Sequence, residues 1–307
     1  MGSHGPPLMS EGMPVVVKRP ERSESAVSYW TASLPAAIWV AIAVTGVFGR
    51  TLFGIGGSWF DDKAEMGHGV FVPFAAAYMV WIKRDSLKRM SPEPSAWGLV
   101  VVGWGVTQSI IGIAAQWVWI SRTAVLIVVI GCLLSLYGFR VLFELAYPIL
   151  TLFLMIAPPT FIFERITLPL QLLASRLGEV VLELLGYSVF REGNILELVG
   201  EKLAVEEACS GIRSLVALLF LCVVYSFFFV PESVIRGILV AAVVPIAILC
   251  NAGRIIATGV VGQYNRDLAH GMLHEAFGHV GLILGAVLCL LLHHLIRKLP
   301  GFRPRYA

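Results

Sequence analysis

The sequence predicts an all-α protein, a polytopic transmembrane helical bundle of about eight spans with a small extracytoplasmic cap that contains a short β-hairpin. Composition is the first reason: 57% of the 307 residues are hydrophobic and 14% are charged, whereas soluble domains contain roughly 45–50% apolar and about 25% charged residues. Second, the apolar residues form long runs, and third, basic residues gather at the ends of these runs. A net charge of +3 distributed in this way indicates membrane orientation rather than nucleic-acid binding.

The chain divides into three parts. Residues 1–29 are polar and rich in Pro and Ser, which predicts a disordered cytoplasmic tail. Residues 30–297 form the predicted transmembrane domain, and residues 298–307 form a basic cytoplasmic tail. A bilayer core of about 30 Å requires roughly 20 apolar helical residues per crossing. This criterion predicts crossings at 34–53, 68–83, 96–116, 120–139, 141–157, 212–230, 234–261 and 277–296.

Residues 161–187 differ from these runs because charged residues recur among leucines at helical spacing. We predict an amphipathic helix along the membrane interface, with a ninth crossing as the alternative. Basic residues in short loops set the orientation. They follow the second and the last predicted crossings, at Lys83, Arg84, Lys88, Arg89, Arg297, Lys298, Arg303 and Arg305. Eight crossings place both groups in the cytoplasm, which leaves 54–67, 158–211 and 262–276 outside.

The external segment 158–211 contains the only strand signal. Residues 194–205 show partial alternation of apolar and polar side chains on both sides of Gly200 and Glu201. This pattern predicts a short β-hairpin, or two extended strands, that leads toward the next helix.

Cys209 is the only one of the five cysteines outside an apolar run. It directly precedes the helix expected from about residue 212, where unsatisfied N–H groups favour a thiolate. Glu206 and Glu207 come before it. If the helix already begins at Cys209, Arg213 follows one helical turn later on the same face. The alternative interpretation is that Ser210 caps the helix and that Cys209 is a small buried residue.

Asn251 and Arg254 interrupt the apolar run 234–261 in its outer half. An arginine inside a span costs roughly 2.5–3.5 kcal/mol on insertion scales, and such residues usually face the bundle interior and serve a function. The alternative is an ion pair or carbonyl contact that only holds helices together.

Three histidines, His270, His274 and His279, open the last predicted crossing from the outside. The zinc motif HExxH is absent, because the residue four positions after His274 is Gly278. We therefore expect no metal and no cofactor. One imidazole is expected to act as a general acid or base, and the others to be solvated at the interface.

Asp61, Asp62 and His68 precede the second predicted crossing. They predict an external polar collar or part of a binding site, with interfacial capping as the alternative.

The strongest prediction rests on three residues that the predicted topology brings to the same side of the membrane. The predicted topology places Cys209, Arg254 and His274 in one leaflet, from three different helix ends. A thiol nucleophile needs a nearby base or cation, a histidine can transfer the proton, and an arginine can stabilise an oxyanion or hold a carboxylate.

Three blocks of the sequence resemble those of the exosortase/archaeosortase family. They are Glu206-Glu-Ala-Cys209-Ser-Gly-Ile-Arg213, then Asn251-x-x-Arg254, then His274-x3-Gly278. The segments 185–194 and 68–73, with Trp81 and Arg84, fit the same family, so the resemblance covers about 30–297. It implies that Cys209, Arg254 and His274 are the catalytic residues. It further implies that Arg213, Glu206, Glu207, Asn251 and His68 bind the substrate or support the site.

The resemblance also implies an activity and a location. Exosortases are multi-pass proteins of the bacterial inner membrane, understood as cysteine transpeptidases or proteases that cleave C-terminal PEP-CTERM sorting signals. They tend to accompany exopolysaccharide biosynthesis. The expected partners are therefore the lipid bilayer and membrane-anchored proteins with a C-terminal sorting helix, with the active site on the extracytoplasmic side. A multi-pass transporter, or a scaffold component of an exopolysaccharide export system, is the alternative function.

Overall fold

The computed structural model describes residues 24–61, 66–198, 201–204, 212–265 and 272–299. Most of the described residues are helical, which confirms the all-α class. The α-helices are α1 (Glu24–Ser58), α2 (Phe71–Leu87), α3 (Trp97–Ala114), α4 (Val118–Glu144), α5 (Ala146–Leu152), α6 (Thr160–Leu184), α7 (Ile212–Phe229), α8 (Ser233–Tyr264) and α10 (Met272–Lys298). Two short 3-10 helices, η1 (Gly67–Val70) and η2 (Phe153–Met155), precede α2 and follow α5.

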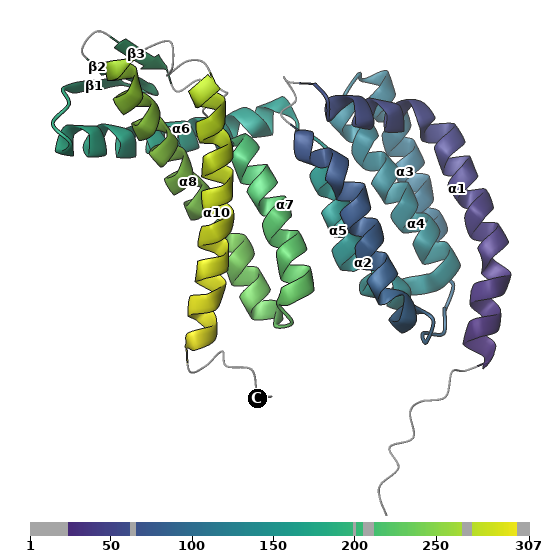
Figure 1. Cartoon of the computed structure of the whole chain (residues 1–307). Coiled ribbons are helices and arrows are strands. Elements are labelled where there is room, and N and C mark those ends of the chain that lie inside the picture. Colours follow the sequence, from purple (N-terminus) through teal and green to yellow (C-terminus); the bar gives the residue numbers. More distant parts are fainter. Residues whose placement is uncertain (1–23, 62–65, 199–200, 205–211, 266–271, 300–307) are drawn as a thin grey trace, which may run out of the picture.

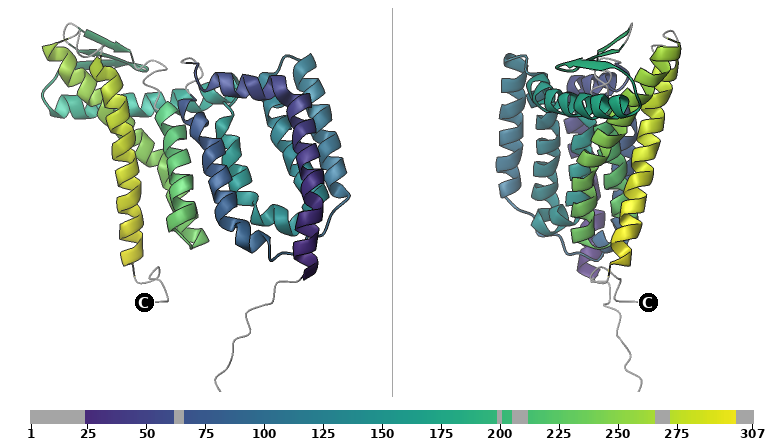
Figure 2. Two further views of the ribbon diagram at one scale, coloured as in Figure 1. Left: turned by 45° about the vertical axis from the view of Figure 1, so that its right-hand side comes forward. Right: turned by 90° about the vertical axis from the view of Figure 1, so that its left-hand side faces the viewer.

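The long helices run roughly side by side (Figures 1 and 2). Helix α1 begins and α10 ends at the same end of the molecule, while α6 and a small sheet lie at the opposite end (Figure 1). Helix α7 contacts α8 and α10 on one side and α2 and α5 on the other. It therefore joins the first half of the chain to the second.

The predicted number of about eight spans is not confirmed. Five of the described helical segments are long and apolar enough to cross a membrane: Tyr29–Ser58, Trp97–Ala114, Val118–Glu144, Ser233–Tyr264 and Ala276–Lys298. The other three predicted crossings correspond to α2, which has 17 residues, and to the shorter apolar helices Ala146–Met155 and Ser214–Phe229. Helix α6 is not among the five and lies crosswise to its neighbours (Figure 1), as expected for a helix along an interface.

The predicted hairpin is part of a larger sheet. Strands β1 (Val189–Glu192), β2 (Ile195–Leu198) and β3 (Glu201–Ala204) form a three-stranded antiparallel sheet in sequence order. The prediction missed β1, which is joined to β2 through Gly193 at a φ of 63° and Asn194. This Gly-Asn pair between two alternating segments is a hairpin signal that was available in the sequence.

The sheet packs onto α6 and α8 through one buried cluster, formed by Ala174, Leu182, Leu196, Leu198 and Ile255. The α6–α8 contact is close, because a Cβ on Gly178 would lie 3.1 Å from Cγ2 of Ile255. Burial at about 25 cal/mol per Å² of apolar surface thus fixes α6 and the sheet on the C-terminal end of α8.

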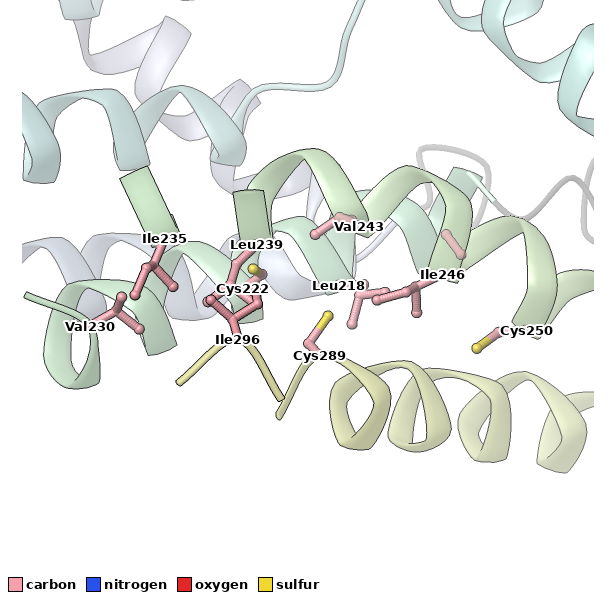
Figure 3. Close-up of a cluster of buried hydrophobic side chains, with 11 residues drawn as sticks. Leu218, Cys222, Val230, Ile235, Leu239, Val243, Ile246, Cys250, Cys289 and Ile296 are labelled. Carbon is pink, nitrogen blue, oxygen red and sulfur yellow. The ribbon is translucent and has the colours of Figure 1, made fainter. Parts of the chain in front are cut away.

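A second cluster joins α7, α8 and α10 along their length. Figure 3 shows buried side chains from all three helices in mutual proximity, including Leu218, Cys222, Leu239, Cys250 and Cys289. In an apolar solvent, helices associate through close packing of this kind rather than through exclusion of water. The cluster therefore holds together the helices that contain the predicted site residues Arg254 and His274.

Helices α3 and α4 pack through glycines. Gly98, Gly105 and Gly112 recur every seven residues on α3, and all three are buried against α4. At Gly105 a Cβ would stand 2.7 Å from Cγ2 of Val128, and at Gly112 it would stand 2.6 Å from the backbone nitrogen of Ser121. Small residues of this kind allow two membrane helices to approach closely.

We expect Gly98→Ala to destabilise the protein by about 1–3 kcal/mol, the usual cost of overpacking. The new methyl group would lie 2.6 Å from the carbonyl oxygen of Gly131 and would also clash with the backbone of Ser135. Gly103→Ala on the same helix is the matched control, because no atom lies within 4 Å of its Cβ position. Thermal unfolding of the two purified variants in detergent measures the difference, and equal melting temperatures would contradict the close contact.

Candidate active site

Arg254 of α8 reaches across to α10. Its guanidinium lies against Gly278: the Cζ, Nη1 and Nη2 atoms are 3.5, 3.6 and 3.7 Å from the position that a Cβ on Gly278 would occupy. These three similar distances indicate that the planar group faces the glycine. Arg254 is half-buried, so its charge lies inside the helix contact, as predicted for an arginine within an apolar run.

One face of α10 contains glycines that lie against α8 and α7. Gly278, Gly281 and Gly285 lie three to four residues apart and therefore share a face. A Cβ on Gly285 would be 3.0 Å from Cδ2 of Leu218 in α7 and 3.6 Å from Sγ of Cys250 in α8. Three helices thus meet along this face of α10.

His274 lies four residues before Gly278 within α10, and residues four apart are neighbours on a helix face. Its position in the helix is therefore one turn from the glycine that Arg254 contacts. The structure describes the backbone here, while the side chain of His274 lies outside the described part.

Asn251 lies one turn before Arg254 on α8 and is 6% exposed. Its burial supports the prediction that the two polar residues face the interior of the bundle. Arg213 is the second residue of α7, and its side chain is not described. Cys209, Glu206 and Glu207 lie outside the described residues, as do His270 and Asp62.

His68 occupies a different place from Arg254. Its Nε2 donates a hydrogen bond to the carbonyl oxygen of Leu154 in η2 at 3.1 Å, and its ring centroid lies 6.1 Å from that of Phe220 in α7. Phe220 belongs to the cluster that α7 shares with the first half of the chain, whereas Leu218 belongs to the cluster with α8 and α10. His68 therefore lies on the other side of α7 from Arg254.

The contacts of His68 support the fold of this region. Beside His68, Trp59 donates a hydrogen bond through Nε1 to the carbonyl oxygen of Met155 at 3.1 Å and covers Gly69. These bonds tie the end of α1 and η1 to η2.

His279 and Asp61 are exposed. Within the described part of the chain, no group of three His, Cys, Asp or Glu side chains is arranged to hold a metal ion.

We compared the chain with models of protein families to find the family to which it belongs. The family model described as Transmembrane exosortase (Exosortase_EpsH) matches residues 59–292. The chain belongs to the exosortase family. The matched range contains Arg254, His274 and Gly278. No curated protein and no solved structure matches the chain.

In this exosortase the sequence prediction missed the glycine face of α10 beyond Gly278. Gly281 and Gly285 continue the same face, and small residues at a spacing of three to four are typical of close contacts between membrane helices. That spacing was a visible signal, but it was not used because glycines contribute no chemistry of their own.

We expect Gly278→Val to reduce processing of a sorting-signal substrate at least tenfold while the exosortase still accumulates in the membrane. A Cβ at this position would already be in contact with the guanidinium, so the two further methyl groups of valine would displace Arg254. Gly253→Val in α8 is the control, because no atom lies within 4 Å of its Cβ position. Substrate cleavage at equal membrane abundance measures the effect, and full activity of Gly278→Val would show that the position of Arg254 is unimportant.

Proposed function

We propose that this exosortase is a membrane-embedded cysteine transpeptidase or protease that cleaves C-terminal PEP-CTERM-type sorting signals of exported proteins in the assembly of exopolysaccharide and the cell surface. Membership of the exosortase family supports a membrane-embedded role in processing sorting signals. The observation that carries the proposal is the contact of the Arg254 guanidinium with Gly278, one helical turn from His274. It brings a guanidinium group next to the helix position of a candidate general base.

Cys209 is the proposed nucleophile. It stands three residues before the start of α7, and three residues of extended chain span at most about 10 Å. Since Leu218 of the same helix contacts Gly285 on the glycine face of α10, the chain can deliver a thiol to the outer end of that face. The positive end of the α7 dipole favours the thiolate.

The reaction follows from these assignments. His274 takes the proton of the Cys209 thiol, and the thiolate attacks the carbonyl carbon of the scissile peptide bond. Arg254 stabilises the negative oxygen of the tetrahedral intermediate. The C–N bond then breaks, His274 gives its proton to the leaving amine, and a thioester to Cys209 remains. An amine, a hydroxyl group or water accepts the acyl group and frees the thiol.

The proposed site suits a substrate that is anchored by one helix. Arg254 and Gly278 lie in the halves of α8 and α10 that are nearer to α6 and the sheet. We propose that this end faces the extracytoplasmic side of the bacterial inner membrane, so that a sorting motif just outside a transmembrane helix reaches the site without leaving the bilayer.

The test is to co-express the exosortase with a PEP-CTERM substrate protein and to follow the size of the substrate. We expect wild type to shorten the substrate and Cys209→Ala to leave it intact. Cys132→Ala, in α4, is the matched control and should process normally. Processing that survives Cys209→Ala would overturn the mechanism. If the protein were instead a transporter or a scaffold, Cys209→Ser would leave it working.

A further inference from the structure

A partly open cavity lies between α5, η2, α7 and α8, away from the candidate active site. Its volume is about 180 Å³, and it is lined by Tyr147, Leu150, Thr151, Leu154, Leu219, Val223 and Val240. The two polar side chains in the lining use their hydroxyl groups within the protein. Tyr147 donates to the carbonyl oxygen of Val223 at 2.9 Å, and Thr151 donates to that of Tyr147 at 2.9 Å. The cavity therefore offers an apolar wall.

The shape of the cavity limits what can enter it. Its lining on α5 and η2 runs from Tyr147 to Leu154, which at 1.5 Å per helical residue is about 10 Å of length. An α-helix with its side chains is about 10–12 Å across, which is about as wide as the cavity is long, so the cavity suits an apolar group narrower than a helix. It leaves room for a single hydrocarbon chain.

Arg236 lies at one end of the cavity. It is one helical turn before Val240 on the same face of α8, and its guanidinium carbon stands 5.4 Å from the ring centroid of Tyr147. Its Nε donates a hydrogen bond to the carbonyl oxygen of Val230 at 2.5 Å. Its two Nη groups make no hydrogen bond or ion pair with any residue that the structure describes.

A second cation stands near the same aromatic residues. Nζ of Lys83 lies 5.8 Å from the ring centroid of Phe227, and the Phe227 ring lies 5.2 Å from that of Tyr147. Lys83 is already paired with Glu144 at 2.9 Å. Of these two cations, Arg236 is therefore the one whose N–H donors remain available. Arg236 lies in the first turn of α8, which begins at the end of the molecule where α1 begins and α10 ends (Figure 1).

We propose that the cavity binds one acyl chain of an anionic phospholipid, whose phosphate is held by Arg236. A guanidinium donates paired N–H groups that match a phosphate, and anionic lipids attract basic residues at the cytoplasmic surface of a membrane. The hydrocarbon chain supplies the van der Waals contacts that the side chains around an empty apolar cavity lack. The bound lipid would brace α7 against α5 and α8, at a distance from the proposed catalytic residues.

The test uses the purified full-length protein, native mass spectrometry, and titration with phosphatidylglycerol or phosphatidylcholine. We expect one phosphatidylglycerol to remain bound per chain, and phosphatidylcholine to need at least a tenfold higher concentration. Arg236→Gln removes the charge, and Val240→Phe fills the cavity while the charge stays. Each should weaken retention at least tenfold. Arg84→Gln is the control, because its guanidinium stacks on Trp81 at 3.9 Å and does not line the cavity.

Four outcomes would overturn the proposal. Unchanged retention in Arg236→Gln would exclude the phosphate contact. Unchanged retention in Val240→Phe would exclude the acyl chain. Displacement of the lipid by inorganic phosphate at equal concentration would indicate a site for a free anion, and displacement by a peptide of a sorting helix would assign the cavity to the substrate. The melting temperature of each variant, measured without added lipid, separates loss of binding from loss of folding.

Discussion

Arg254→Lys is expected to abolish most processing while the protein still inserts and accumulates. Lysine keeps the positive charge but replaces a planar fork of donors by a compact ammonium group. The guanidinium of Arg254 spreads over Gly278, with Cζ and both Nη atoms at 3.5–3.7 Å from its Cβ position, a contact that an ammonium group cannot reproduce. Removal of one oxyanion donor typically costs about 10²–10³ in rate, so we expect a loss of that order.

The rate of substrate cleavage in isolated membranes, normalised to the amount of enzyme, measures this loss. Arg140→Lys is the matched control, since Arg140 is largely exposed and paired with Glu93 at 3.3 Å. Reduced membrane abundance of Arg254→Lys would mean that the arginine stabilises the bundle. Full activity would show that the guanidinium is a structural counter-charge and that its role at the oxyanion is wrong.

His274→Ala is expected to lower processing by about 10²–10⁴, the range associated with a general acid or base. The position lies one turn from Gly278 on α10, next to the position that Arg254 contacts. Loss of the imidazole would leave the thiol of Cys209 without a proton acceptor and the leaving amine without a donor. The effect should fall on the catalytic rate, because the proposed proton transfers belong to the chemical step and not to the binding of the substrate.

His279→Ala and His270→Ala are the matched controls for this position and should be milder. His279 follows Gly278 directly on α10 and is exposed, so its position is rotated by about 100° from the glycine that Arg254 contacts. Single-turnover cleavage by the three variants, at equal abundance, separates the histidines. If His279→Ala is inactive and His274→Ala is harmless, the wrong imidazole has been assigned.

Hydropathy predicted the helical class, whereas its count of about eight crossings is not confirmed by the described helices. The run 141–157 was predicted as one crossing, yet it contains the end of α4, the seven-residue α5 and the 3-10 helix η2. A window of apolar residues does not detect such breaks. The neighbouring turn in α4 depends on Gly138, whose φ of 79° is open mainly to glycine. The carbonyl group of Glu93 also lies so close to Gly138 that no side chain would fit there. Such tertiary contacts are invisible to composition.

The candidate site was predicted in part. Asn251 and Arg254 stood out as polar residues in an apolar run, and the structure places them inside the helix contact. The partner surface on α10 did not stand out, because glycines add neither charge nor hydropathy. Only the fold shows that Gly278 receives the guanidinium. The prediction for Cys209 remains a prediction, since that residue lies outside the described part of the chain.

The glycine contact between α3 and α4 has a consequence for the order of biogenesis. The two helices follow each other in the chain, and each residue in their contact is present once residue 144 has been synthesised. Because domains generally fold from the N-terminus during synthesis, this helical hairpin can be complete inside the membrane while α8 and α10 are still to be translated. The half of the protein without the proposed catalytic residues would then serve as the preformed surface on which α7, and after it the catalytic half, assembles.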